Sequence, residues 1–296
     1  MMKFYIVTPS YNALQWLQSC VRSVADQVSE TVQVHHHIQD GASNDGTVEW
    51  LMEWQQQHAG NSGYQLTFES AKDTGLYDAI NQAWKKLPQE ADVTAHLNAD
   101  EQYLPGVFAA VAAEMEKHPD ADMLLTAHIV LDKDSRYICH RRPTFPSKVV
   151  SRAITQIITN TCFHRASTFR KRGIYFDCSF RSLADLVFFR DIMFTNPRIC
   201  RMPDLFGSVF VVTGSNVSWS EITAGERLRI SSELPLVLKK SIPLFVKAQG
   251  LFGLVYDCFR QAPREYAIYL TDDVQRTTFA IKHPTHRWNM RSIGES

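Results

Sequence analysis

Two adjacent carboxylates, Asp100 and Glu101, follow the apolar segment 93–97, with Asn98 and Ala99 immediately before them. Carboxylate and amide oxygens are the ligands that hard divalent cations such as Mn²⁺ and Mg²⁺ take in proteins. A cation held there can bridge two diphosphate oxygens and stabilise the charge of a leaving diphosphate. We therefore predict that Asp100 binds Mn²⁺ or Mg²⁺, and that Asn98 and Ala99 line the site of the substrate's diphosphate.

Further polar residues gather in the segments 9–12, 40–47 and 71–81. Asp40 can accept a hydrogen bond from the imide N–H of uracil or from a ribose hydroxyl, as acidic residues do in dinucleotide-binding folds. Its expected partner is the preceding turn, which consists of Pro9, Ser10, Tyr11 and Asn12. Asp78 and Asn81 lie one helical turn apart, and either contact the donor or are polar members of a mostly buried helix.

The elements that position these residues alternate between strands and helices. Strands are predicted at 4–8, 32–39, 66–70 and 93–97, and helices at 13–27, from 47, and at 77–87. This alternation is typical of an α/β domain with a mostly parallel sheet and helices on both faces. Ligands bind such sheets beyond the carboxyl ends of the strands. The polar segments follow those ends, so we expect them to converge in space.

These segments resemble, in order, the motifs of family 2 of the glycosyltransferases. Residues 8–12 are similar to the family's opening T-P-[ST]-Y-N, and residues 40–47 to its D-G-G-S-x-D-G-T loop. Residues 73–81, which begin with Asp73, resemble the D-x-G-[IL]-Y-D-A-[MI]-N stretch of one branch, and residues 98–101 stand where that branch has N-S-D-D. Residues 163–165 and 183–185 stand where the family has F-[FH]-R and A-A-D. The resemblance covers roughly residues 3 to 230.

The resemblance implies a Rossmann-like GT-A fold and inverting transfer of a sugar from a nucleotide-diphosphate donor, most commonly a UDP-sugar. It implies an acceptor that is a saccharide or a lipid-linked molecule of cell-surface polysaccharide assembly. Asp73, Asp78 and Asn81 are then expected to contact the donor. Two positions depart from the pattern: Asn98 replaces the first carboxylate of a full metal motif, and Glu101 replaces an aspartate. We therefore expect the metal to be bound mainly through Asp100.

Asp185 matches the position of the family's catalytic base. An inverting transfer needs a general base on the acceptor side of the sugar, because the attacking hydroxyl must lose its proton. Apolar residues behind Asp185, at 188, 189 and 192, predict a helix face that holds the carboxylate at the pocket rim. The structural alternative is a helix N-cap, or an ion pair with Arg181 or Arg190.

Composition narrows the function classes further. Lys plus Arg and Asp plus Glu both number 31, so the chain carries no net charge that would favour nucleic acid as a partner. The six cysteines include no C-x-x-C pair, which fits a reducing, cytoplasmic setting, and neither a signal-peptide core nor a spanning helix is expected. His35, His36 and His37 resemble a metal-binding tract, but strand alternation would send His36 to the opposite face. We interpret them as structural.

We predict a GT-A domain over 1–234, with a nucleotide-sugar half at 1–103 and an acceptor half at 104–234. A helical tail at 235–296 follows, and its apolar residues, including Phe245, Leu251, Phe252, Val255, Tyr256 and Phe259, either pack on the domain or lie peripherally on the inner face of a membrane.

A sugar nucleotidyltransferase is disfavoured because no Gly-rich loop follows the first strand. A non-catalytic nucleotide-sugar binder stays open because of Asn98.

Overall fold

The computed structural model describes residues 1–60, 63–213, 221–255, 258, 261–262, 264–271 and 273–286. Its first part follows the predicted alternation, although the ends of individual elements differ from those predicted. The elements are β1 (Met2–Ser10), α1 (Leu14–Ala25), β2 (Val32–Asp40), α2 (Thr47–Gln57), β3 (Tyr64–Ser70), α3 (Leu76–Trp84) and β4 (Val93–His96). These strands are parallel to their neighbours in the order β3-β2-β1-β4. The predicted α/β fold is confirmed here.

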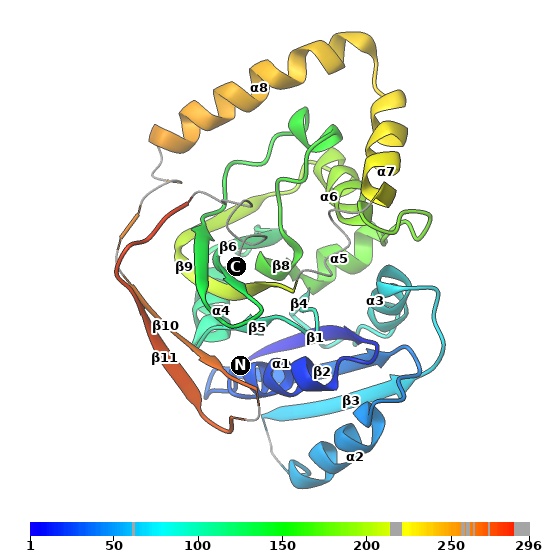
Figure 1. The fold of residues 1–296 in the computed structure, drawn as a ribbon, viewed down its shortest axis with the longest axis vertical. Coiled ribbons are helices and arrows are strands. Elements are labelled where there is room, and N and C mark those ends of the chain that lie inside the picture. Colours follow the sequence, from blue (N-terminus) through cyan, green and yellow to red (C-terminus); the bar gives the residue numbers. More distant parts are fainter. Residues whose placement is uncertain are drawn as a thin grey trace.

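The second part of the chain extends the same sheet with mixed strand directions. It adds β5 (Gln102–Tyr103), β6 (Met123–Asp132), β7 (Tyr137–Arg141), β8 (Cys162–Arg165) and β9 (Ile199–Val212). Within the described residues the order is β3-β2-β1-β4-β8-β6-β9-β5, with β7 on β6. β8 is antiparallel to both β4 and β6, whereas β6 and β9 are parallel. One sheet therefore runs through both predicted halves of the domain (Figure 1).

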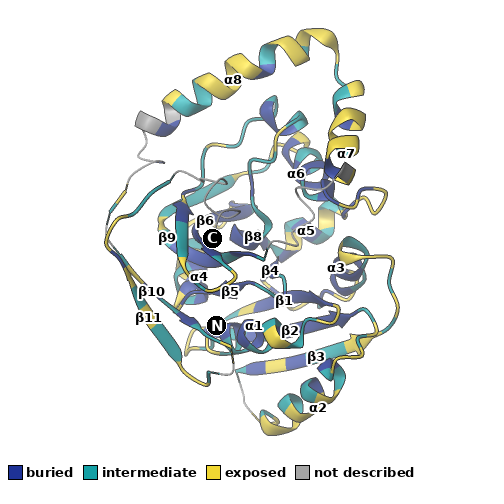
Figure 2. Ribbon diagram, viewed as in Figure 1, coloured by how far each residue is buried: buried dark blue, intermediate teal, exposed yellow. Residues whose placement is uncertain are grey.

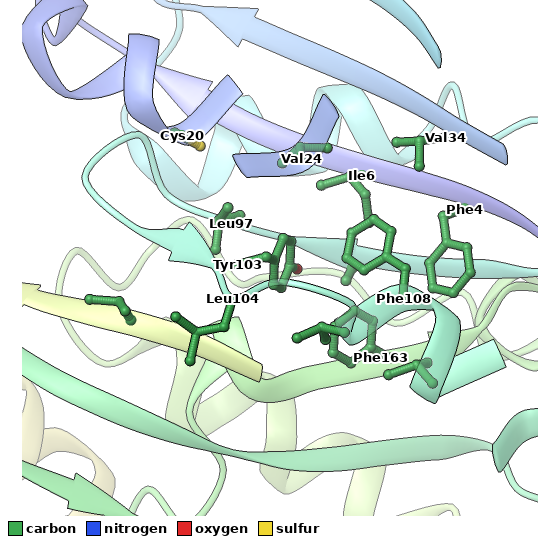
Figure 3. Packing of buried hydrophobic residues seen from close by; sticks show 14 of the residues in the cluster. Phe4, Ile6, Cys20, Val24, Val34, Leu97, Tyr103, Leu104, Phe108 and Phe163 are labelled. Atoms are coloured by element: carbon green, nitrogen blue, oxygen red, sulfur yellow. The ribbon is translucent and has the colours of Figure 1, made fainter. Parts of the chain in front are cut away.

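Side chains of β1 alternate between two apolar layers, one on each face of the sheet. Phe4 and Ile6 point into a layer with α1 and α4 (Val107–Lys117), where the rings of Phe4 and Phe108 stack with centroids 4.6 Å apart. Figure 3 shows these rings beside Tyr103 and Phe163. Tyr5 and Val7 enter the other layer, under α3, α5 (Ala166–Arg172) and α6 (Ala184–Phe194). Period-2 alternation in β1 thus fixes which helices cover which face.

The three consecutive histidines of β2 bond threonine side chains of the neighbouring strands. His35 Nε2 and His37 Nδ1 lie 2.8 and 2.9 Å from Thr67 Oγ1. His36 is on the other face, where its Nε2 lies 2.9 Å from Thr8 Oγ1. The predicted alternation and structural role are confirmed, and burial lowers the pKa of His36 to about 3, so this ring is neutral at physiological pH.

The C-terminal part is helical only at its start, which corrects the prediction of a helical tail over 235–296. α7 (Glu221–Ser232) and α8 (Leu236–Val255) are followed by an antiparallel hairpin of β10 (Arg264–Tyr269) and β11 (Arg276–Ile281). Tyr266 and Ile268 alternate with more exposed residues and join the core beside α1, a strand pattern of period 2 rather than a helical one. Tyr256 and Phe259 lie outside the described residues, as do the side chains of Phe252 and Val255. No helix among the described residues has the length and apolar character needed to cross a membrane.

Candidate active site

The polar segments predicted to converge lie together at the carboxyl edge of the sheet. Ser10, Asp40 and Ser70 are the last residues of β1, β2 and β3 and are register partners across the three strands. β4 ends slightly earlier, and the N–H of Leu97 donates to the carbonyl of Val7. The loop that leads from β4 to Asp100 therefore starts beside the end of β1.

The loops after β1 and β2 are bonded to each other. The Asn12 N–H donates to Ser43 Oγ at 2.8 Å, and the Asn44 N–H donates to Asn12 Oδ1 at 2.9 Å. The Leu14 N–H at the start of α1 donates to Asp45 Oδ2 at 3.0 Å. This bracing holds Asn12 at a φ of 48°, a left-handed conformation that asparagine tolerates. A rigid turn results before any ligand binds.

The turn at 9–12 presents two groups that a ligand can use. Tyr11 is 67% exposed, which offers an aromatic face for a nucleotide base. Ser10 is buried, and within the described part of the chain its Oγ has no hydrogen-bond partner. An unsatisfied buried hydroxyl is costly and marks a place where a ligand can complete the bonding.

Asp40 organises the loop that follows it. Its carboxylate has no exposed surface and accepts from the Ser43 N–H at 2.9 Å, Ser43 Oγ at 2.5 Å and Ser70 Oγ at 2.6 Å. A Cβ on the neighbouring Gly41 would lie 2.9 Å from Asp73 Oδ2 and 3.3 Å from the Tyr11 ring. Glycine at 41 therefore allows three loops to meet. Any contact between Asp40 and a donor would replace one of the existing bonds.

The loop after β3 and the start of α3 carry the other predicted donor contacts. Asp73 Oδ1 accepts from the Gly75 N–H at 2.8 Å, and burial raises its pKa, aided by the charges of Asp78 and Asp40. Asp78 accepts from the Thr74 N–H at 3.0 Å, and this bond holds its pKa below the usual value. Asp73 thus lies beside the loop at Gly41, whereas Asp78 is bonded to the loop that leads into α3.

Asn81 has a different position from Asp73 and Asp78. Its Nδ2 donates to the carbonyl of Phe176, and its Oδ1 accepts from the Phe176 N–H, both at 2.9 Å. The side chain is buried, and it also bonds Cys178. Asn81 therefore joins α3 to the segment at residues 176–178.

The predicted metal ligands lie in a closed turn. The Asn98 N–H donates to Glu101 Oε2 at 2.9 Å, and the Glu101 N–H donates to the Asn98 carbonyl at 3.0 Å. Asn160, in a short helical turn at Thr159–Thr161, donates to Glu101 Oε1 at 2.9 Å. Glu101 is 1% exposed, and burial raises its pKa well above the usual value. Glu101 thus holds the turn together through its own carboxylate, and Asp100 lies beside it.

Two oxygens of this turn fit a hard divalent cation. Asp100 is half-buried, and burial raises the pKa of its carboxyl to about 6. Asn98 Oδ1 is buried and has no partner among the residues that the structure describes. A carboxylate and an amide oxygen two residues apart are suitable donors for Mg²⁺ or Mn²⁺, which take their other ligands from substrate phosphates and water.

Asp185 lies in the first turn of α6. Burial raises the pKa of its carboxyl to about 6, while the Leu186 N–H, which donates to Oδ1 at 2.7 Å, opposes this rise. Tyr77 of α3 is close by, and its OH donates to the Ser182 carbonyl. Burial raises the pKa of Tyr77, and the charge of Asp185 raises it further. Arg190, the alternative ion-pair partner considered for Asp185, pairs with Asp191 and Glu233.

Glu226 of α7 is a residue that the sequence did not single out. Its carboxylate accepts from the backbone N–H groups of Arg181, Ser182 and Leu183, at 2.5, 3.0 and 2.8 Å. These residues lead directly into α6, so an anion from a distant segment holds the end of the helix that carries Asp185. A glutamate within α7 has no local sequence signal for this role.

Another group with metal-ligand side chains lies at the opposite edge of the sheet. Ligand atoms of Glu114, His118 and Cys200 are within 4.8 Å of one another, near the starts of β6 and β9. Glu114 already pairs with Lys117 and His118. Because of its location, this group is separate from the predicted site at Asp100.

Comparison with known families identifies the family to which the chain belongs. The sequence model of glycosyl transferase family 2 matches residues 5–175, more than half of the chain. The chain belongs to glycosyltransferase family 2. The protein is therefore a glycosyltransferase, and the predicted family is confirmed.

Solved structures with the same fold include other glycosyltransferases. S. aureus TarS 1–349 in complex with UDP-GlcNAc matches with a TM-score of 0.59 and 18% identity, over 81% of this chain and 70% of that one. A mannosyltransferase from Pyrobaculum calidifontis in complex with GDP-Man and Mn²⁺ matches with a TM-score of 0.57 and 15% identity, over 85% and 75%. GalNAc-T7 with UDP, GalNAc and Mn²⁺ matches with a TM-score of 0.55 and 13% identity, over 87% of this chain and 55% of that one. No curated protein sequence matches the transferase.

Proposed function

We propose that this transferase moves a sugar, with inversion, from a UDP-sugar or related donor to a saccharide or lipid-linked acceptor in cell-surface polysaccharide assembly, at the cytoplasmic side of a membrane. The observation that carries the proposal is the closed turn at 98–101. It holds the Asp100 carboxylate and Asn98 Oδ1, which has no partner among the described residues, beside the loops that follow β1, β2 and β3. Complexes of fold neighbours with UDP-GlcNAc and GDP-Man support a nucleotide-sugar donor.

The donor is expected to lie across the loops. Tyr11 and Ser10 contact the base and ribose, with Pro9, Asn12 and Asp40 shaping that pocket, and Asp73 and Asp78 line the sugar side. Ala99 borders the diphosphate. A divalent cation, Mn²⁺ or Mg²⁺, held by Asp100 and Asn98 Oδ1, would neutralise charge on the diphosphate. Mn²⁺ in the complexes of two fold neighbours supports the presence of a cation.

Asp185 is proposed as the general base. It takes the proton of the acceptor hydroxyl as that oxygen attacks the anomeric carbon from the side opposite the diphosphate. A pKa of about 6 suits this task, because the carboxylate is ionised at neutral pH yet more basic than an exposed aspartate.

Donor hydrolysis or transfer by purified protein tests the proposal. UDP-sugars are screened by the rise in melting temperature that binding produces, and turnover is then measured with and without Mn²⁺. Asp100→Ala should lose Mn²⁺-dependent turnover, whereas Asp92→Ala, remote from the loops, should retain it. Wild-type, Mn²⁺-dependent turnover by Asp100→Ala would remove Asp100 from the site. Donor affinity without any turnover in the wild-type protein would support the non-catalytic binder instead.

A further inference from the structure

Helix α8 has two unlike faces. On the inner face Ile242 is buried, and the side-chain amide of Gln249 donates to the carbonyl of Phe145. Gly253 on the same face is also buried. These contacts fix the helix to the body of the protein by one side, so packing accounts for only part of its apolar character.

The outer face of α8 carries exposed apolar side chains and lysines. Leu236, Val237, Leu244 and Leu251 are 67%, 77%, 69% and 64% exposed. Lys240 and Lys247 are exposed between them in the sequence. At 3.6 residues per turn, these six positions fall within an arc of about 100°. Figure 2 shows exposed residues along much of this helix, which lies at the periphery of the molecule.

The charge of this face selects its partner. The sequence of α8 contains lysines at 239, 240 and 247 and neither aspartate nor glutamate. A second copy of the same helix is a poor occupant, because a seam through 237, 240, 244, 247 and 251 would place Lys240 and Lys247 against like charges. An anionic lipid surface offers both an apolar boundary for the leucines and phosphates for the lysines.

We propose that the outer face of α8 binds the surface of an anionic lipid bilayer, with its apolar side chains at the boundary between headgroups and acyl chains. The helix would lie along the surface. Lysines beside the leucines extend their charged ends to lipid phosphates while their methylene chains stay with the apolar layer.

The surface is linked to the acceptor half of the transferase. α8 begins at Leu236, shortly after α7 ends at Ser232, and Glu226 of α7 bonds the backbone that leads into α6 and Asp185. Membrane binding would thus bring a lipid-linked acceptor to the side of the proposed base. Only this last step rests on the proposed function; the lipid-binding face stands without it.

Vesicle flotation of the full-length protein tests the proposal. The vesicles are phosphatidylcholine alone, or phosphatidylcholine and phosphatidylglycerol in equal parts. The wild type should float with the anionic vesicles and far less with the neutral ones. Leu244→Glu with Leu251→Glu should lower the bound fraction more than about tenfold, and each of Lys240→Ala and Lys247→Ala about fivefold. Both leucines are exposed, so the fold should be unaffected.

Met52→Glu is the matched control, because Met52 is a 57% exposed apolar residue on another helix, α2. It should float like the wild type. A wild-type protein that does not float with anionic vesicles, or a Leu244→Glu/Leu251→Glu variant that floats normally, would overturn the proposal. So would a dimer in vesicle-free sedimentation that the double variant dissociates, since the face would then bind a second copy. Donor hydrolysis is measured alongside, so that failure of the transferase reaction is recognised separately.

Discussion

The proposed donor edge, formed by the loops at 9–12 and 40–47, and the start of α6 are both held in place by hydrogen bonds, but in different ways. At the donor edge, loops from neighbouring strands bond one another through Asn12, Ser43 and Asp45. At the start of α6, rigidity comes from Glu226, which reaches the backbone from α7. The first region is thus set by the motifs themselves, and the second by tertiary packing. Variants in the two regions should therefore fail in different ways.

The largest effect is expected at the base. Asp185→Asn keeps the size and hydrogen-bonding reach of the side chain but removes its basicity, so turnover should fall by roughly 10²–10⁴-fold. Donor affinity, measured by calorimetry, should stay unchanged. If affinity and rate fall together, Asp185 belongs to the donor edge, and the base must be sought at Asp191 or Asp177.

The pH dependence of the wild type gives an independent measurement at the same residue. Asp185 must be ionised to accept a proton, and burial raises its pKa to about 6. The value of kcat/KM should therefore fall as the pH drops below about 6, tenfold for each further unit. A flat profile between pH 5 and 7, a window of about one unit on either side of that pKa, would argue against Asp185 as the base.

A smaller effect is expected when α6 loses its anionic anchor. Glu226→Gln removes a charge that raises the pKa of Asp185, so the acid limb of the rate profile should move to lower pH and turnover should fall by about tenfold. Glu233→Gln, whose exposed side chain pairs with Arg190 at 3.9 Å, is the control and should leave the profile in place. A fall in rate with an unshifted limb would mean that Glu226 contributes to stability alone.

At the donor edge we expect an effect on binding and stability rather than on the pH profile. Asp40→Ala leaves the hydroxyls of Ser43 and Ser70 without their acceptor, which should lower folding stability by about 1–3 kcal/mol. Donor binding should weaken by a comparable amount, because Asp40 shapes the pocket. Calorimetry and urea unfolding measure the two quantities. Unchanged values of both would show that the loop does not depend on Asp40.

The smallest effect concerns Ala42, which has a φ of 64° where the family pattern has glycine. A left-handed conformation costs a residue with a Cβ roughly 1–2 kcal/mol. Glycine removes this cost, but it also raises the conformational entropy of the unfolded chain, which offsets part of the gain. Ala42→Gly should therefore raise the free energy of unfolding by about 0.5–1 kcal/mol. Urea unfolding measures this change, and a loss of stability would show that the conformation is not strained.

The contrast between the two regions also separates what the sequence could predict from what it could not. The strand ends and the polar loops after them were predictable, because period-2 alternation in β1 and turn residues such as Asn12 act locally. The bond between Glu101 and Asn160 was not, since it joins distant segments. Nor was the hairpin β10–β11, whose period-2 pattern follows a strongly helical stretch. Predicted roles in donor binding and catalysis stay predictions.

The place of β8 in the sheet has a consequence for how the chain folds during synthesis. β4 is made early, but its free edge is covered only when residues 162–165 arrive to pair with it. At ribosomal rates of about 5–20 residues per second, that edge stays unpaired for on the order of ten seconds. During that time the unpaired edge of the nascent chain is open to misassociation, and this transferase should depend on chaperones more than a protein whose neighbouring strands are made in succession.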